Sequence, residues 1–321
     1  MANLPKTAER IVLLFCHGGG YHKNTWKPII RRIQQSPLLQ VVPCEYVSVD
    51  LRFHGDKYDH SDPGRIFYEG DEKTSPRVVH PVREWTKFAP LDILEHLKEI
   101  RAQHDRPTRV VGIGHSMGAS TLLKVETMHP RSFDGLVMFE PVCNAKQMRE
   151  AAKTVVDAMV SATLAREGAW DDWDGVIKHF STSKRYRRWH KECMDAFLDG
   201  GVLKTPEGYR LALQPIPEAS LYCHDVMDFP LDVLANVGCK VDFQFGEHTD
   251  DVQPADGGGR SHAAAGQVPR AHWTDRRHDA RHGARGSRRV RAPHRERALA
   301  VPRFSAAQQQ HAVENLRIAG G

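Results

Sequence analysis

Short apolar runs alternate with stretches of helical periodicity along the first 140 residues of the chain. The run Ile11–Cys16 predicts a buried parallel strand, because a strand covered on both faces is apolar at every position. Further strands are predicted at Cys44–Asp50, Val110–Ile113, Leu136–Phe139 and Val241–Phe245, and helices at Asn24–Ile33, Phe88–His104 and Met117–Met128. This alternation with short connections predicts an α/β fold with a mostly parallel sheet.

The alternation stops between Pro141 and Pro230, where the sequence is helix-like and rich in aromatic residues. Because this stretch lies between two predicted strands, we interpret it as a helical lid inserted over the carboxyl edge of the sheet, where open α/β sheets bind ligands. The same aromatic side chains are also typical of a core that belongs to the insertion itself. They are Trp170, Trp173, Phe180, Tyr186, Trp189 and Phe197.

The composition changes near residue 251. The 321 residues carry a net charge of +5, but residues 252–321 hold 13 Arg, no Lys and five acidic residues, which makes this tail +8 and the rest −3. Only ten of the 70 tail residues are Val, Ile, Leu, Met, Phe, Trp or Tyr, too few to offset the chain entropy of folding. We therefore expect a core in residues 1–140, a lid in 141–230, a last core strand and loop in 231–251, and a largely irregular tail in 252–321.

Several classes of function are excluded by these patterns. The basic stretch Arg276–Arg297 has no aromatic residue on which bases could stack, so no specific nucleic-acid partner is expected. No apolar run approaches the roughly 18–20 residues that span a bilayer, so no membrane partner is expected. The six cysteines are scattered without a CxxC pair, which argues against zinc and against a disulfide framework. We expect a reduced, cytoplasmic protein, because no secretory signal and no S-K-L-type address is present.

The strongest chemical signal is the segment Gly114-His115-Ser116-Met117-Gly118. It follows a predicted strand and opens a predicted helix, which is the context of a G-x-S-x-G nucleophile elbow. A serine on such a tight turn has a strained backbone, and side chains two residues away on either side would collide. The helix that follows points its first amides at the site, where negative charge is favoured. We therefore interpret Ser116 as a nucleophile rather than as an ordinary turn serine.

A second signal is His17-Gly18-Gly19-Gly20, directly after the first predicted strand. Glycines allow a backbone to approach a substrate closely. The amides of Gly19 and Met117 could donate to the oxygen of a tetrahedral intermediate and so form an oxyanion hole. A phosphate-binding loop would need GxxxxGK[ST] or GxGxxG, and neither is present.

These motifs, in this order, resemble the α/β-hydrolase superfamily over about residues 10–250. HGGG (17–20) resembles its oxyanion loop, and DLRFHGD (50–56) the loop after its next strand. VVGIGHSMGAS (110–120) is similar to its elbow, and HPRSFDGLVMFEPV (129–142) to its following strand. Within that superfamily, HGGGYHKNTWKPI (17–29) and HPRSFDGLVMFEPV (129–142) look most like a fungal group of peroxisomal hydrolases from toxin-biosynthesis clusters. This would place the protein in peroxisomes by resemblance alone.

The resemblance implies that a catalytic acid follows the strand after the lid. It maps onto the loop after Phe245, and Asp250 is our choice, because a carboxylate at a strand end can accept the imidazole N–H of the base. Glu247 and Asp251 are alternatives, and Glu140, which follows an earlier strand, is a further one.

The base is where the sequence departs from that superfamily, which uses a histidine near the C-terminus. No tail histidine follows a final strand or precedes an apolar helix. The weak candidates are His272, His278 and His282. In the mapped region we expect the histidines to line the site or lie on the surface; these are His17, His54, His115 and His248.

The tail has the composition of a GC-rich reading frame translated out of register, because all its basic charge is Arg. A one-nucleotide shift at Asp251 permits Met-Phe-Asn-Pro after Asp250. The same shift over 279–299 permits a segment that resembles the superfamily's catalytic-histidine loop and last helix. We therefore hypothesise a frameshift at codon 251.

The combined prediction is a serine hydrolase of carboxylic esters, lactones or thioesters that acts on a small-molecule acyl substrate, with no metal or organic cofactor. A serine at the elbow argues against dehalogenase or epoxide hydrolase chemistry, which uses Asp there. Two alternatives remain: a catalytically impaired binding protein that lacks the base, and an acyltransferase with the same residues. The sequence does not indicate an oligomeric state.

Overall fold

The computed structural model describes residues 10–70, 75–103, 107–142, 149–183, 185–186, 189–223 and 227–245. The predicted irregular tail lies outside these residues. So do several candidate site residues: Glu247, His248, Asp250, Asp251, His272, His278 and His282.

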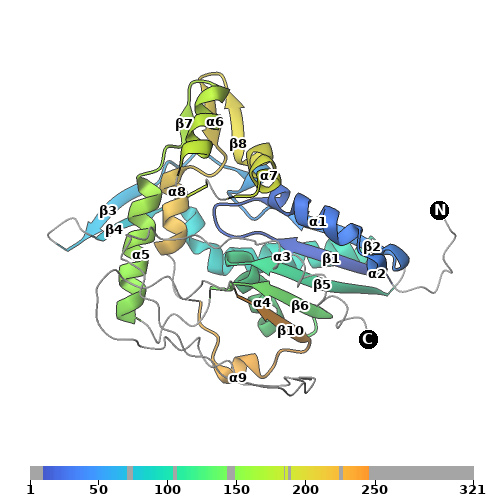
Figure 1. The fold of residues 1–321 in the computed structure, drawn as a ribbon. Coiled ribbons are helices and arrows are strands. Elements are labelled where there is room, and N and C mark those ends of the chain that lie inside the picture. The colour runs from blue at the N-terminus through green and yellow to red at the C-terminus, as the bar shows by residue number, and fades with distance from the viewer. Residues whose placement is uncertain are drawn as a thin grey trace, which may run out of the picture.

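A five-stranded sheet forms the centre of the described structure (Figure 1). Its strand order is β10-β6-β5-β1-β2, and every neighbouring pair is parallel. The strands are β1 (Arg10–Cys16), β2 (Cys44–Val49), β5 (Thr108–His115), β6 (Gly135–Phe139) and β10 (Lys240–Gln244). The prediction of an α/β fold with a mostly parallel sheet is therefore confirmed, and each predicted strand is present to within two residues.

Helices and short 3-10 turns connect these strands. On the core these are η1 (Lys23–Trp26), α1 (Lys27–Gln34), α2 (Pro37–Val41), η2 (Gly55–Lys57), η3 (Pro81–Glu84), α3 (Trp85–Ala102), α4 (Met117–Met128) and α9 (Leu231–Leu234). The helix predicted from Phe88 begins earlier, at Trp85. The turn η3 that leads into it begins with a local signal, because the Val82 amide donates to Nδ1 of His80 at 3.1 Å and Pro81 occupies the first position of that turn.

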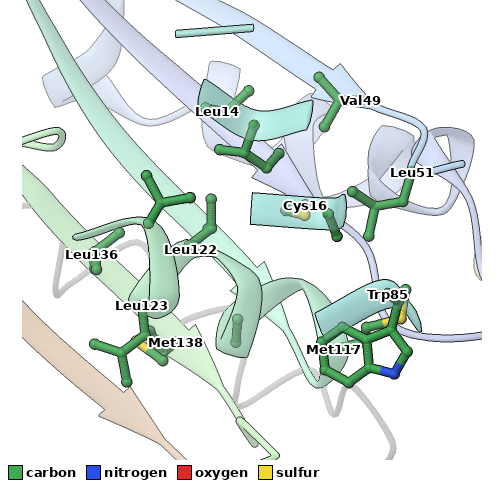
Figure 2. Packing of buried hydrophobic residues seen from close by; sticks show 14 of the residues in the cluster. Leu14, Cys16, Val49, Leu51, Trp85, Met117, Leu122, Leu123, Leu136 and Met138 are labelled. Atoms are coloured by element: carbon green, nitrogen blue, oxygen red, sulfur yellow. The ribbon is translucent and has the colours of Figure 1, made fainter. Parts of the chain in front are cut away.

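The alternation of side chains along β1 divides the core into two layers. Val12, Leu14 and Cys16 point to one face and pack with α3 and α4, whereas Leu13 and Phe15 point to the other and pack with α1. Figure 2 shows the first layer, in which residues of β1, β6 and α4 pack closely together. Both faces of β1 are therefore dry, which explains its uninterrupted apolar sequence.

The segment between β6 and β10 contains helices and a small second sheet. Its elements are α5 (Arg149–Leu164), β7 (Ala169–Trp170), α6 (Trp173–Thr182), α7 (Lys191–Gly201), β8 (Val202–Thr205), β9 (Gly208–Leu211), α8 (Pro215–Ser220) and η5 (Leu221–Cys223). The antiparallel sheet β7-β9-β8 was not predicted from the sequence. Its strands have two to four residues, too short to leave a period-two pattern.

Most aromatic residues of this segment form a core of their own. Trp170, Phe180, Tyr186 and Phe197 are buried together, and Trp189 packs against them. Trp173 differs, since it is 40% exposed. The second interpretation of these residues, an internal core, therefore accounts for most of them.

A β-hairpin that the sequence analysis did not predict supports the same segment. It consists of β3 (Arg65–Glu69) and β4 (Ser75–Val79) and lies beside α5 and α8 (Figure 1). Val78 of β4 is fully buried against Val160 of α5 and Ala219 of α8. Every residue of β3 is exposed, so the strand lacks the buried apolar alternation by which strands are predicted. Among the described helices, none is long and apolar enough to cross a membrane.

Candidate active site

Ser116 stands at the sharp turn between β5 and α4. Its backbone has φ 49° and ψ −117°, in the region that L-residues rarely adopt. The residues on either side are buried, but Ser116 itself is partly exposed. Its hydroxyl makes no hydrogen bond with any described residue, including the first turn of α4, which it precedes. The turn therefore presents a free hydroxyl at the helix N-terminus.

The two glycines of this turn are needed for close packing. A Cβ on Gly114 would lie 2.5 Å from Cα of Ala119 in α4. A Cβ on Gly118 would collide with the carbonyl oxygens of Cys16 and His17. The predicted collision on either side of Ser116 is therefore present. The second contact also brings the end of β1 directly against the first turn of α4.

The glycine loop after β1, residues 17–20, lies beside this turn. A Cβ on Gly19 would lie 3.8 Å from Sδ of Met117 and 3.1 Å from Cδ1 of Leu221. Neither the Gly19 amide nor the Met117 amide donates a hydrogen bond to a described residue. The two backbone donors predicted for an oxyanion hole thus come from adjoining segments and are unused.

Two buried histidines hold the glycine loop in place. His17 donates from Nδ1 to the Gly18 carbonyl at 2.8 Å, and its Nε2 accepts from the Leu51 amide at 3.1 Å. His54 donates from Nδ1 to the Arg52 carbonyl at 2.8 Å, and its Nε2 accepts from the Gly20 amide at 3.3 Å. Both rings use both nitrogens for the fold, so neither has a nitrogen left to act as the base.

These histidines are neutral. Burial, reinforced by the neighbouring His54, holds the pKa of His17 well below its ordinary value. Burial lowers the pKa of His54 to about 4, and it does the same for His115. His115 lies under the loop, where a Cβ on Gly18 would meet its Nδ1 at 2.6 Å. We expected these residues to line the site or lie on the surface; all three are buried supports of the glycine loop and the serine turn.

Among the described residues, Glu140 is an acidic residue that directly follows the strand next to β5. It follows β6, whose last residue, Phe139, pairs with His115 of β5. Its backbone is also in the left-handed region, with φ 47°, and its amide donates to the Gln244 carbonyl of β10 at 2.9 Å. Two strained residues, Ser116 and Glu140, therefore stand at the ends of neighbouring strands.

A buried ion pair that the sequence analysis missed lies against the same loop. Arg166 donates two hydrogen bonds to Glu218, each 2.6 Å long, and both side chains are almost completely buried. A Cβ on Gly20 would lie 2.8 Å from Oε1 of Glu218. Burial alone would raise the pKa of Glu218, but Arg166 outweighs this and holds it below the ordinary value. No spacing in the sequence signals this pair, because its members are 52 residues apart.

The described residues contain no group of three or more His, Cys, Asp or Glu side chains placed to hold a metal ion. The arrangement can supply a nucleophilic hydroxyl, two backbone donors and one carboxylate at the sheet edge. It supplies these from four segments: the turn at Ser116, the glycine loop, α4 and the end of β6.

Comparison with known proteins shows the family of the chain. The family model described as "Alpha/beta hydrolase family" matches residues 13–302, most of the chain. The chain belongs to this family. The match extends beyond residue 250, where the resemblance from the motifs ends. It supports the superfamily assignment made from the sequence.

Individual relatives match shorter stretches. The type I acyl-CoA thioesterase mpaH of Penicillium roqueforti is 26% identical over 106 residues, which are 33% of this chain and 24% of that protein. The peroxisomal membrane protein LPX1 of Saccharomyces cerevisiae is 28% identical over 138 residues, which are 43% of this chain and 32% of that protein. The chain thus spans about a quarter to a third of the length of these relatives.

Among solved structures, the peroxisomal alpha-beta-hydrolase Lpx1 of Saccharomyces cerevisiae is similar with a TM-score of 0.53 and 16% identity. The superposition covers 75% of this chain and 71% of that one. At this identity the likeness supports the α/β-hydrolase fold.

Proposed function

We propose that this member of the alpha/beta hydrolase family is a serine hydrolase of carboxylic esters or thioesters, with Ser116 as the nucleophile. One observation carries the proposal: a strained, unbonded serine at a helix N-terminus, packed against a glycine loop. Ser116 attacks the acyl carbonyl, a base takes its proton, and the acyl-enzyme is then hydrolysed by water. Lactones remain within the same chemistry.

The amides of Gly19 and Met117 are the proposed oxyanion donors. Both are unused within the described residues, and the contact of Gly19 with the Met117 side chain brings the two segments together. The Gly20 amide is excluded, because it donates to His54. Donors fixed in advance stabilise the developing negative charge without reorganisation, and losing one typically costs on the order of 10²–10³ in rate.

Two carboxylates compete for the role of the acid that orients the base. Asp250, chosen from the sequence, lies outside the described residues and stays a proposal. Glu140 is favoured by two observations: it ends the strand beside the serine turn, and it is held in a strained backbone conformation. We therefore propose Glu140 as the first candidate and Asp250 as the second.

The base is proposed to be a histidine outside the described residues, since His17 and His54 are engaged by the fold. His272, His278 and His282 are the weak candidates from the sequence. A chain that lacks a working base would bind acyl compounds without turning them over. Acyl transfer to another acceptor uses the same residues and differs from hydrolysis only in its products.

A fluorophosphonate probe tests the proposal directly, because it reacts with an activated serine. We expect labelling of the native chain and none of the Ser116→Ala variant. Ser120→Ala is a matched control, since Ser120 is a buried serine of the same helix whose hydroxyl bonds to the Val142 carbonyl. Equal labelling of the native chain and Ser116→Ala would refute the mechanism. Binding of p-nitrophenyl esters without turnover would instead support the impaired alternative.

The compartment is a separate proposal. Both yeast comparisons carry the word peroxisomal in their names. The sequence predicted the cytoplasm, with peroxisomes as the alternative that the resemblance implies. Imaging of a fluorescent fusion beside a peroxisomal marker distinguishes the two.

A further inference from the structure

The loop between α6 and α7 carries a dense positive charge. Residues 184–188 read Lys-Arg-Tyr-Arg-Arg, with four cations and no acid. Within this loop Arg185 turns inward, and its guanidinium carbon lies 5.8 Å from the centre of the Tyr186 ring. Its Nε is buried without a hydrogen-bond partner in the described structure. A buried, unpaired donor on a cation is costly, so this feature calls for a partner.

The one carboxylate among the described groups that interact with Arg185 does not supply that partner. This carboxylate is Glu218, and both of its oxygens are already taken by Arg166. Within the described residues around Glu218, two arginines therefore face a single carboxylate, and one positive charge is left over.

The other groups that face Arg185 are neutral. Tyr21, Tyr186 and Tyr222 interact electrostatically with it. Burial raises the pKa of all three hydroxyls, that of Tyr222 to about 12. The hydroxyls of Tyr186 and Tyr222 share hydrogen bonds with the Arg185 side chain, but they do not cancel its charge at neutral pH.

This leftover charge adjoins the proposed active site. Tyr21 follows the glycine loop, and its ring lies 5.8 Å from that of His115, the residue before Ser116. Glu218, which also interacts with Arg185, lies against Gly20. Arg185 as a whole stays partly exposed, although its Nε is buried. A substrate group bound here would sit beside the loop that holds the acyl carbonyl.

We propose that Arg185 binds an anionic group of the substrate, either a carboxylate on the acyl chain or a phosphate on the leaving group. The proposal rests on the proposed function and names the substrate class of that site. A guanidinium offers the forked donors that fit both anions, and it is less costly to desolvate than an ammonium.

Binding to the Ser116→Ala variant tests this without requiring turnover. Two matched ligand pairs separate the sources of charge. One pair is p-nitrophenyl hydrogen glutarate against p-nitrophenyl valerate, which differ by a carboxylate. The other is butyryl-CoA against butyryl-N-acetylcysteamine, which differ by the phosphate-bearing part of the carrier. Titration calorimetry gives the ratio of affinities within each pair.

We expect the anionic member of at least one pair to bind about tenfold or more tightly, the size of one charge-assisted hydrogen bond. Adding Arg185→Met should remove that preference, and Arg185→Lys should restore part of it. Lys178→Met is the control, because Lys178 is an exposed cation of α6 in the same segment, and the preference should survive there.

Absence of any anionic preference in both pairs would overturn the proposal, and so would a preference that persists in Arg185→Met. If that variant does not fold, Arg185→Gln replaces it with the same expectation. Failure of the proposed function is distinguishable, because it shows as unlabelled Ser116 in the native chain, whereas these affinities are measured without the nucleophile.

Discussion

The amide of Ser116 donates a hydrogen bond of 2.8 Å to the carbonyl of Phe139, the last residue of β6. This bond fixes the serine turn to the strand that ends immediately before Glu140. The strained conformation of Ser116 and that of Glu140 are therefore held by one local network, which reaches β10 through the bond from the Glu140 amide to Gln244.

This relationship predicts that Glu140, rather than Asp250, is the carboxylate that orients the base. Glu140→Gln should lower kcat for p-nitrophenyl butyrate by about 10²–10⁴, the range for an acid that orients a catalytic base. Asp250→Asn should cost less than about tenfold. Steady-state kinetics on both variants gives the answer, with fluorophosphonate labelling as a check that the serine turn is intact. The opposite order of effects would return the role to Asp250.

Gly118→Ala should disrupt both the fold and the site. The added methyl would press on the carbonyls of Cys16 and His17, which are backbone atoms and yield only if β1 and α4 separate. We expect a loss of about 2 kcal/mol or more in the free energy of unfolding, together with loss of serine labelling. Gly135→Ala is the control, because its methyl would lie 3.7 Å from the nearest atom, at ordinary contact distance. Equal stability of the two variants in urea unfolding would contradict the packing described.

Stability should fall in mild acid because of the buried histidines. The pKa values of His54 and His115 are about 4 in the folded chain, against an ordinary 6.5. A histidine whose folded pKa is depressed contributes its full stability above pH 6.5 and loses it as the pH falls toward 4. Each contribution is about 3 kcal/mol. Urea unfolding at pH 7, 6, 5 and 4.5 measures how steeply the free energy of unfolding falls with pH. His115→Gln should make this fall shallower.

The ion pair between Arg166 and Glu218 should be expensive to break. Glu218→Gln leaves a buried guanidinium without its counter-charge, and we expect a cost of about 3–5 kcal/mol. The depressed pKa of Glu218 also predicts a pH dependence. The stabilisation from the pair is present above pH 4.5, the ordinary pKa of the carboxyl, and it is lost as the pH falls through the lower pKa of the folded chain. Thermal unfolding of Arg166→Met with Glu218→Gln, beside each single variant, separates the pair from its parts. Additive losses would show that the two side chains do not stabilise one another.

The stability lost on replacing an aromatic residue between β6 and β10 with Ala should depend on how buried that residue is. Phe197 is 4% exposed and belongs to the internal core, so Phe197→Ala should cost about 3–5 kcal/mol. Trp173 is 40% exposed, so Trp173→Ala should cost less than half as much. Chemical denaturation of the two variants compares their free energies of unfolding. A larger loss at Trp173 would mean that it is covered in solution.

The hypothesis of a shifted reading frame makes a prediction about the transcript. An extra or missing nucleotide should be found near codon 251. Sequencing across that codon tests this. A clean read in the present frame, with related chains that carry the same Arg-rich tail, would end the hypothesis.

Much of the framework of the candidate site could be predicted because it depends on local sequence. The turn at Ser116 needs its glycines two residues away on either side, and buried β1 needs an unbroken apolar run, so both leave a readable pattern. The Arg166–Glu218 pair, the bonds of the His54 ring nitrogens and the burial of Arg185 Nε depend on contacts between distant segments. The hairpin β3–β4 and the sheet β7-β9-β8 are too short or too exposed to show an alternation of buried and exposed residues.

Helix α7 is joined to α1 by charged contacts at the surface. Glu192 accepts from Arg31 and Arg32, and Lys27 reaches Asp199 at 2.7 Å. Exposed pairs of this kind are each worth roughly 0.2–1 kcal/mol and weaken in salt. If α7 must swing away before a product can leave, turnover will quicken as ionic strength rises, while the dry packing beneath the central strands will be unaffected.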